Sequence, residues 1–193
     1  TELIESPVGQ DEVALLDVLV SPSHHLSLAR ALKSPLFGWR DDDLVALAMA
    51  VRAAERPDPS VAAKPTTKPG WWDVLRTVAQ GEANEGFVAL ARTTLARLDL
   101  YRGWLNSLPP HDALSAMYEH GDVLARFASA VPASERGLTL ACLRDLLAQA
   151  LAQDGGRFLT PYRLVRVLKA GGIPASDAHQ QGAVRLLTIH GAK

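Results

Sequence analysis

The chain has 193 residues, 48% of them hydrophobic and 21% charged, which is the composition of an ordinary globular domain with a substantial core. Twenty basic and 21 acidic residues give a net charge of −1, so the composition excludes a surface that is basic all over. The single cysteine excludes an internal disulfide and indicates a reducing, cytoplasmic compartment, and no apolar run predicts a signal peptide or a membrane span.

Capping residues, prolines and glycines divide the chain into helices. A capping residue followed by a first-turn proline, as at Ser6-Pro7, predicts a helix start. Three aspartates at 41–43 complement the dipole of another helix start, and four prolines within 55–70 predict an exposed loop. In chain order, the predicted helices cover about 7–20, 24–33, 41–54, 71–79, 87–105, 112–119, 122–130, 140–151 and 161–170.

Two apolar patterns predict strong helices, and a strand pattern lies near the end of the sequence. Apolar residues hold one helical stripe over about five turns within 87–105, and leucines mark a second from Leu140 to Leu151. Residues 184–189 are typical of a short strand, and a lone strand needs a partner for its backbone groups. We therefore expect an all-α helical bundle with one short C-terminal strand, excised from a larger protein, an expectation that the first residue, Thr1, also fits.

The usual motifs of catalysis and metal binding are missing from the sequence. It has no Gly-rich phosphate loop and no paired catalytic groups, and its six histidines share no ligand spacing with one another or with Cys142. We expect no catalytic residue, metal site or cofactor in this chain, and a buried, inert thiol at Cys142. Residues 41–43 could form a metal cluster, but a helix start explains them more simply. Trp71 and Trp72 could stack on bases, but aromatic residues beside such a loop more often pin it to the core.

One segment is basic and contains no acidic residue. Within 155–176 the only charged residues are Arg157, Arg163, Arg166 and Lys169, and the last three recur every third residue along one side of the last helix. This face could hold the phosphates of DNA. It could equally be a solvated face whose cations suit the helix dipole, and the sequence leaves both interpretations open.

Three stretches together resemble one protein family. Residues 28–48, LARALKSPLFGWRDDDLVALA, are similar to the L-x-x-x-L-x-S-P-L-F-G-x-x-D-x-x-L signature of AddA-type helicase–nuclease subunits. Residues 156–169, GRFLTPYRLVRVLK, resemble the helix that precedes motif V, and residues 188–193, TIHGAK, resemble the start of motif V itself, T-x-H-x-A/S-K-G-L-E. The three stretches occur in the family's order and span most of the chain, which therefore resembles part of a UvrD/Rep-type superfamily 1 DNA helicase.

The resemblance implies a position within a larger protein. In this family two RecA-like motor domains carry the ATPase, and a helical subdomain, 2B, is inserted in the second one just upstream of motif V. The resemblance implies a hinge and first helix over 1–20, a 2B-like subdomain over 21–180 and the start of the motif V strand over 181–193. The resemblance implies that the parent is a bacterial DNA helicase of double-strand break repair that requires ATP and Mg. Helicase–nuclease members of the family also have an exonuclease. This piece would itself not be an enzyme.

The resemblance also implies where DNA is contacted. Thr188 and His190, with Gly191 beside them, match motif V residues along the single-stranded DNA track. Related helicases grip duplex phosphates with backbone amides of a G-I-G turn, which is replaced here by residues 38–40, Gly-Trp-Arg. The aspartates that follow would repel phosphate, so the resemblance does not extend to that turn.

Two functions remain open at this point. The leading one is a non-catalytic subdomain that steers duplex DNA or a partner subunit beside the motor domains of the same parent chain. The alternative is a protein-interaction module that docks a partner nuclease subunit without touching DNA. A basic stripe on the surface would favour DNA, and an exposed apolar patch would favour a protein partner.

Overall fold

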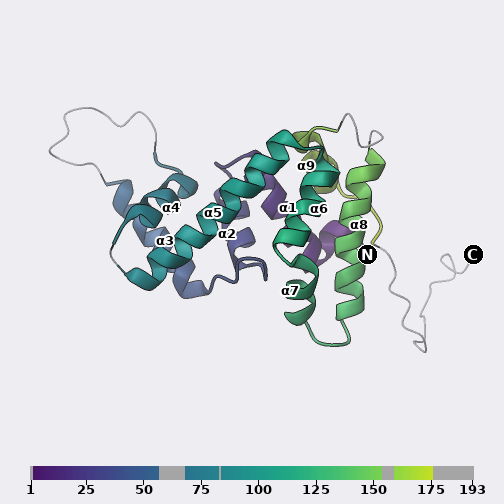
Figure 1. Cartoon of the computed structure of the whole chain (residues 1–193), viewed down its shortest axis with the longest axis horizontal. Helices are drawn as coiled ribbons and strands as arrows, with labels where there is room; N and C mark the ends of the chain where they lie inside the picture. The colour runs from purple at the N-terminus through teal and green to yellow at the C-terminus, as the bar shows by residue number, and fades with distance from the viewer. Residues whose placement is uncertain (1, 57–67, 83, 154–158, 176–193) are drawn as a thin grey trace, which may run out of the picture.

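The computed structural model describes residues 2–56, 68–82, 84–153 and 159–175, and within these ranges the fold is all-α, as the sequence predicts. The predicted strand at 184–189 and the glycines at 155–156 lie outside the described residues. The elements of the described part (Figure 1) are a 3₁₀ helix, η1 (Leu3–Glu5), and the α-helices α1 (Pro7–Val20), α2 (His25–Lys33), α3 (Asp41–Ala54), α4 (Trp71–Gln80), α5 (Glu85–Ser107), α6 (Pro110–His120), α7 (Val123–Ser129), α8 (Arg136–Ala152) and α9 (Pro161–Ala170). None of these helices has the length and apolar character that crossing a membrane requires.

Helix α1 belongs to the core of the bundle. It starts as predicted, with Pro7 in the first turn and the Ser6 hydroxyl accepting a hydrogen bond from Gly9 N at 3.0 Å. Its buried residues lie on every side of the helix rather than in one stripe, and it packs against α2, α5, α8 and α9. A helix that is apolar all round is expected in such an interior position.

Helix α5 is the longest of the described helices and joins the two ends of the molecule. Figure 1 shows it running from the end that holds α3 and α4 to the end that holds α6, α7 and α8. The stripe predicted within 87–105 is confirmed, because buried side chains recur every three or four residues along it. These are Val88, Ala91, Thr94, Leu98, Tyr101 and Leu105.

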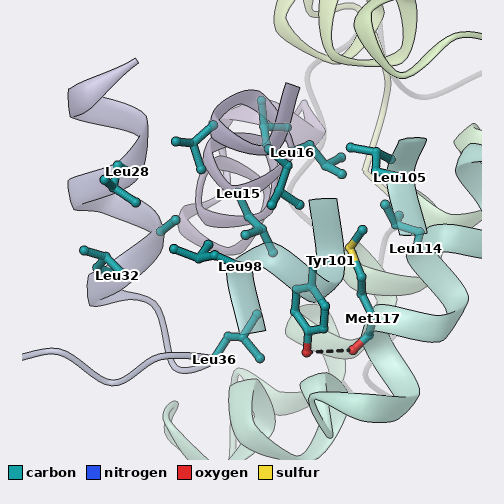
Figure 2. Packing of buried hydrophobic residues seen from close by; sticks show 14 of the residues in the cluster. Leu15, Leu16, Leu28, Leu32, Leu36, Leu98, Tyr101, Leu105, Leu114 and Met117 are labelled. Carbon is teal, nitrogen blue, oxygen red and sulfur yellow. Dashed lines mark hydrogen bonds between the residues drawn. The ribbon is translucent and has the colours of Figure 1, made fainter. Parts of the chain in front are cut away.

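The largest buried side chains meet between α1, α2, α5 and α6. Figure 2 shows Leu15 and Leu16 of α1 facing Leu98 of α5, with Leu28 and Leu32 of α2 on one side and Leu105, Leu114 and Met117 on the other. The Tyr101 hydroxyl donates to the carbonyl of Met117 at 3.5 Å. A Cβ on Gly121 would lie 2.7 Å from both Tyr101 Oη and Leu36 Cδ1, so a larger residue there would have to displace these buried side chains.

Helix α8 has the predicted position but a different buried face. The leucine pattern from 140 to 151 predicts one stripe, yet Leu151 is 55% exposed and Leu140 and Leu147 are only partly buried. The fully buried face is made by Thr139, Cys142, Leu143, Leu146 and Ala150. Apolar residues surround this helix, so its neighbours α1, α6 and α7 decide which of them are covered.

The first and last described segments lie side by side. Leu3 N donates to Ile173 O at 2.9 Å, and Gly172 N donates to the Glu2 carboxylate at 3.0 Å. Glu2 and Pro174 form an antiparallel bridge, which Gly172 allows by turning the chain at a φ of 78°. We call this contact of residues 2–3 with residues 172–174 the end clasp.

Candidate nucleic-acid interface

Helix α9 carries the basic residues that the sequence places on one face. It begins with Thr160, whose side chain accepts a hydrogen bond from Arg163 N at 3.2 Å. The buried side chains Leu164, Val165 and Leu168 attach the helix to the bundle, where it packs against α1. The opposite side of α9 therefore faces solvent.

At least one of the three cations on this side of α9 contacts a neighbouring helix. Arg163, Arg166 and Lys169 are all exposed, as their spacing predicts. However, Lys169 Nζ lies 2.7 Å from the Oδ1 atom of Asp17 in α1. Arg166 forms no hydrogen bond or ion pair with any other residue in the described ranges. The remaining predicted contacts, Arg157, Thr188, His190 and Gly191, lie outside those ranges.

Asp17 is the centre of a polar cluster that the sequence did not reveal. Its side chain is only 5% exposed, and its second oxygen, Oδ2, contacts His24 Nδ1 at 2.9 Å and accepts a hydrogen bond from the Ser27 hydroxyl. Burial by itself would raise the pKa of Asp17, but hydrogen bonds from Lys169, Ser27 and His24 lower it overall. The cluster joins α1, the start of α2 and α9 through one ionised carboxylate.

The middle residue of the turn at 38–40 faces the core, whereas Gly38 and Arg40 on either side of it are exposed. Trp39 is 3% exposed, and its indole N–H donates to the hydroxyl of Thr94 in α5 at 2.8 Å. Gly38 has a φ of 67°, which lets the chain turn out of the preceding segment into α3. Arg40 N, the backbone donor at the start of α3, is occupied by the Asp43 carboxylate at 2.8 Å.

The three aspartates of this turn act as the helix-start interpretation predicts. Helix α3 begins at Asp41, which pairs with Lys33 of α2, and Asp43 caps the backbone of Arg40. Within the described ranges, no group of three or more His, Cys, Asp or Glu side chains is arranged to hold a metal ion.

The two tryptophans differ in exposure. Trp72 is 4% exposed, and Arg102 lies over its ring at 5.9 Å, so its face is not available for stacking on a base. Trp71 is partly buried and stacks on His25 of α2, with ring centroids 6.2 Å apart. Both tryptophans therefore take part in packing around α4. Most of the loop that they were expected to pin to the core, residues 57–67, lies outside the described residues.

Glu12 is a second buried titratable group that sequence reasoning missed. It is 3% exposed, and burial, assisted by the charge of Asp11, raises its pKa to about 8. Burial also raises the pKa of Tyr118 and Cys142, and the Glu12 charge adds to both effects. The signal was present in α1, because an acid flanked by apolar residues on every side of a helix has no solvent face to occupy.

No protein-family model matches this chain, and a search of curated proteins finds no match to it either.

Proposed function

We propose that the chain is a non-catalytic helical module inserted in an ATP-dependent DNA helicase of the UvrD/Rep type, where it steers duplex DNA. The end clasp is the observation that supports an insertion most directly. The chain enters and leaves the described bundle at neighbouring backbone atoms, Leu3 N and Ile173 O, 2.9 Å apart. A host domain can accept such a bundle without moving its own strands apart. The resemblances at 28–48 and 188–193 indicate the kind of host.

In this proposal, helix α9 contacts the DNA. Lys169 is paired with Asp17, and the proposed DNA-binding face consists of the exposed side chains of Arg163 and Arg166, with Arg157 preceding them in the sequence. A guanidinium group matches the geometry of a phosphate well. Two or three such contacts predict weak, non-specific binding, with a Kd of about 10⁻⁴ to 10⁻⁶ M that rises steeply with salt.

The test is DNA binding by the chain with two arginines reversed. Arg163→Glu together with Arg166→Glu is expected to abolish binding of a fluorescent duplex, measured by anisotropy at low salt. The control is Arg52→Glu with Arg56→Glu, which changes the net charge equally near the end of α3, away from α9 (Figure 1). Thr188→Ala should leave binding nearly unchanged, because motif V needs the motor sheet to hold it in place.

The control variant decides whether binding is local. Retention of binding by the α3 double variant and its loss in the α9 double variant support a DNA-binding face on α9. Equal loss in both variants means that only net charge matters, and binding that survives the α9 reversal or ignores salt contradicts the proposal.

The host can be checked in the parent gene. The residues after Lys193 are expected to read Gly-Leu-Glu, which completes motif V, and RecA-like motor motifs are expected on both sides of the module. A parent sequence without those motifs contradicts the helicase assignment, whatever the DNA-binding result.

A second candidate, a protein-interaction module, is favoured by a different observation. Helix α3 exposes two large apolar side chains, Val45 at 58% and Met49 at 65%. Neighbouring exposed apolar side chains are more typical of a protein contact than of a DNA contact.

A further inference from the structure

A pocket of about 560 Å³ lies between the first turns of α3 and the first turns of α5. Its apolar lining comes from Ala46 of α3 and from Phe87 and Leu90 of α5. Its polar lining includes Arg40 and Asp42 from the start of α3. A volume of this size is within the range of sites that hold a small molecule or a few side chains.

The apolar floor of the pocket is held in place from behind. Phe87 packs edge-on against the ring of Trp39, with centroids 5.8 Å apart. Trp39 is itself fixed by its hydrogen bond to Thr94. The turn residue Trp39 and helix α5 therefore hold Phe87 in place, so little reorganisation of this side chain opposes binding.

The charges around the pocket are paired with one exception. Asp41 is paired with Lys33, and Asp43 accepts a hydrogen bond from Arg40 N and lies 3.7 Å from Arg40 Nε. Asp42 is exposed and has no hydrogen bond or ion pair with any residue in the described ranges. The unpaired charge at the pocket is thus negative.

The helix starts beside the pocket offer little to an anion. An amide at the start of α3, Arg40 N, donates to Asp43, and at the start of α5 the amide of Phe87 donates to the side chain of Asn84 at 3.4 Å. The acidic first turn of α3 already complements its dipole. A cation is therefore the better occupant.

We propose that this pocket binds a lysine or arginine side chain of a basic, amphipathic segment in a protein partner. The aliphatic stem of that side chain would lie on Ala46, Phe87 and Leu90, and its charge would reach Asp42. Val45 and Met49 share the outer face of α3 with Asp42 and are exposed, so they would contact apolar residues of the same segment. The site does not depend on whether the host is a helicase.

The probe is an amphipathic peptide of leucine and lysine, about three helical turns long, and its counterpart carries glutamate in place of lysine. Amide signals of the ¹⁵N-labelled chain report the position, because Gly38 and Gly86 both line the pocket. The lysine peptide is expected to shift these two signals, and the glutamate peptide is expected to leave them unchanged.

Two variants test the floor and the charge separately. A Cβ on Gly86 would meet nothing within 4 Å, so Gly86→Leu can place a side chain in the pocket, and it should weaken binding about tenfold or more. Asp42→Asn should weaken it about two- to fivefold. The matched controls are Gly103→Leu, which also meets open space on α5, and Asp41→Asn, whose carboxylate is paired outside the pocket lining.

Binding in which both pocket variants are impaired and both controls are unchanged supports the proposal. Shifts elsewhere on the chain, equal binding of the glutamate peptide, or a duplex oligonucleotide that shifts Gly38 and Gly86 more strongly would overturn it. If Gly86→Leu does not fold, the comparison of Asp42→Asn with Asp41→Asn still decides, because both residues are exposed on the same helix turn.

Discussion

At the scale of single residues, Glu12 links the fold to pH. Its carboxyl group is buried with a pKa of about 8, against 4.5 for an ordinary glutamate. The folded state therefore holds a proton that the unfolded state releases at lower pH. The stabilising effect is complete below about pH 4.5 and is lost as the pH rises through 8.

Glu12→Gln is predicted to remove this pH dependence. Glutamine keeps the shape of the protonated acid but cannot ionise, so its free energy of unfolding should stay nearly constant between about pH 5 and 8. Over the same range the wild-type protein should lose on the order of 1 kcal/mol per pH unit. Urea unfolding at a series of pH values measures the difference.

An exposed glutamate provides the control for that experiment. Glu119 of α6 lies in solvent, so Glu119→Gln should retain the full pH dependence of the wild type. If the wild type itself shows no loss of stability up to pH 8, the Glu12 carboxyl is not held neutral by burial.

At the scale of elements, the contact between Asp17 and Lys169 attaches the last described helix to α1. Lys169→Met keeps most of the aliphatic stem but leaves the buried carboxylate without its ammonium partner. We expect the free energy of unfolding to fall by about 1 to 2 kcal/mol at neutral pH. This loss is smaller than the loss on breaking a fully buried ion pair, because the Lys169 side chain is 46% exposed. The measurement is urea unfolding, extended to a double-mutant cycle with Asp17→Asn.

Another lysine–aspartate pair of this chain serves as the comparison. Lys33 and Asp41 are also in contact, but their side chains are 50% and 82% exposed, so Lys33→Met should change stability by less than about 0.5 kcal/mol. Equal effects of the two lysine substitutions would mean that burial of Asp17 does not strengthen its pairing.

Acid should also weaken the Asp17 contact, because the lowered pKa of this group stabilises the fold above pH 3.8 and ceases to do so as the pH falls.

The elements also show what a sequence can predict and where it stops. Caps and prolines mark helix starts locally, so α1, α3 and α9 begin within a residue of their predicted positions. The face of α5 was predictable because its apolar residues form a single stripe. The face of α8 was not, because its apolar residues surround the helix and only its neighbours select among them. For the same reason the pairing of Lys169 with Asp17, 152 positions earlier, left no local pattern in the basic segment.

At the scale of the whole molecule, the end clasp brings the first and last described segments to one place. Leu3 is hydrogen-bonded to Ile173 and Gly172 to Glu2, so a linker of a few residues can join the last described segment to the first. Joining these segments and opening the chain elsewhere should therefore preserve every packed helix. The exposed turn at 132–135, between α7 and α8, is a suitable opening point because it contributes nothing to the buried core.

A circular permutant is the resulting prediction. Residues 2–175, joined end to start by a short glycine–serine linker and opened between Ala133 and Ser134, should fold with the helical content of the linear chain. Its unfolding free energy should lie within about 2 kcal/mol of that of a linear chain of residues 1–175, since only one loop is closed and another opened. Circular dichroism and urea unfolding compare the two. A permutant opened between Leu15 and Leu16, inside the buried helix α1, should not fold. If the linear 1–175 chain folds and the permutant opened at the turn does not, the two ends are not neighbours in solution, and the case for an inserted module loses its structural support.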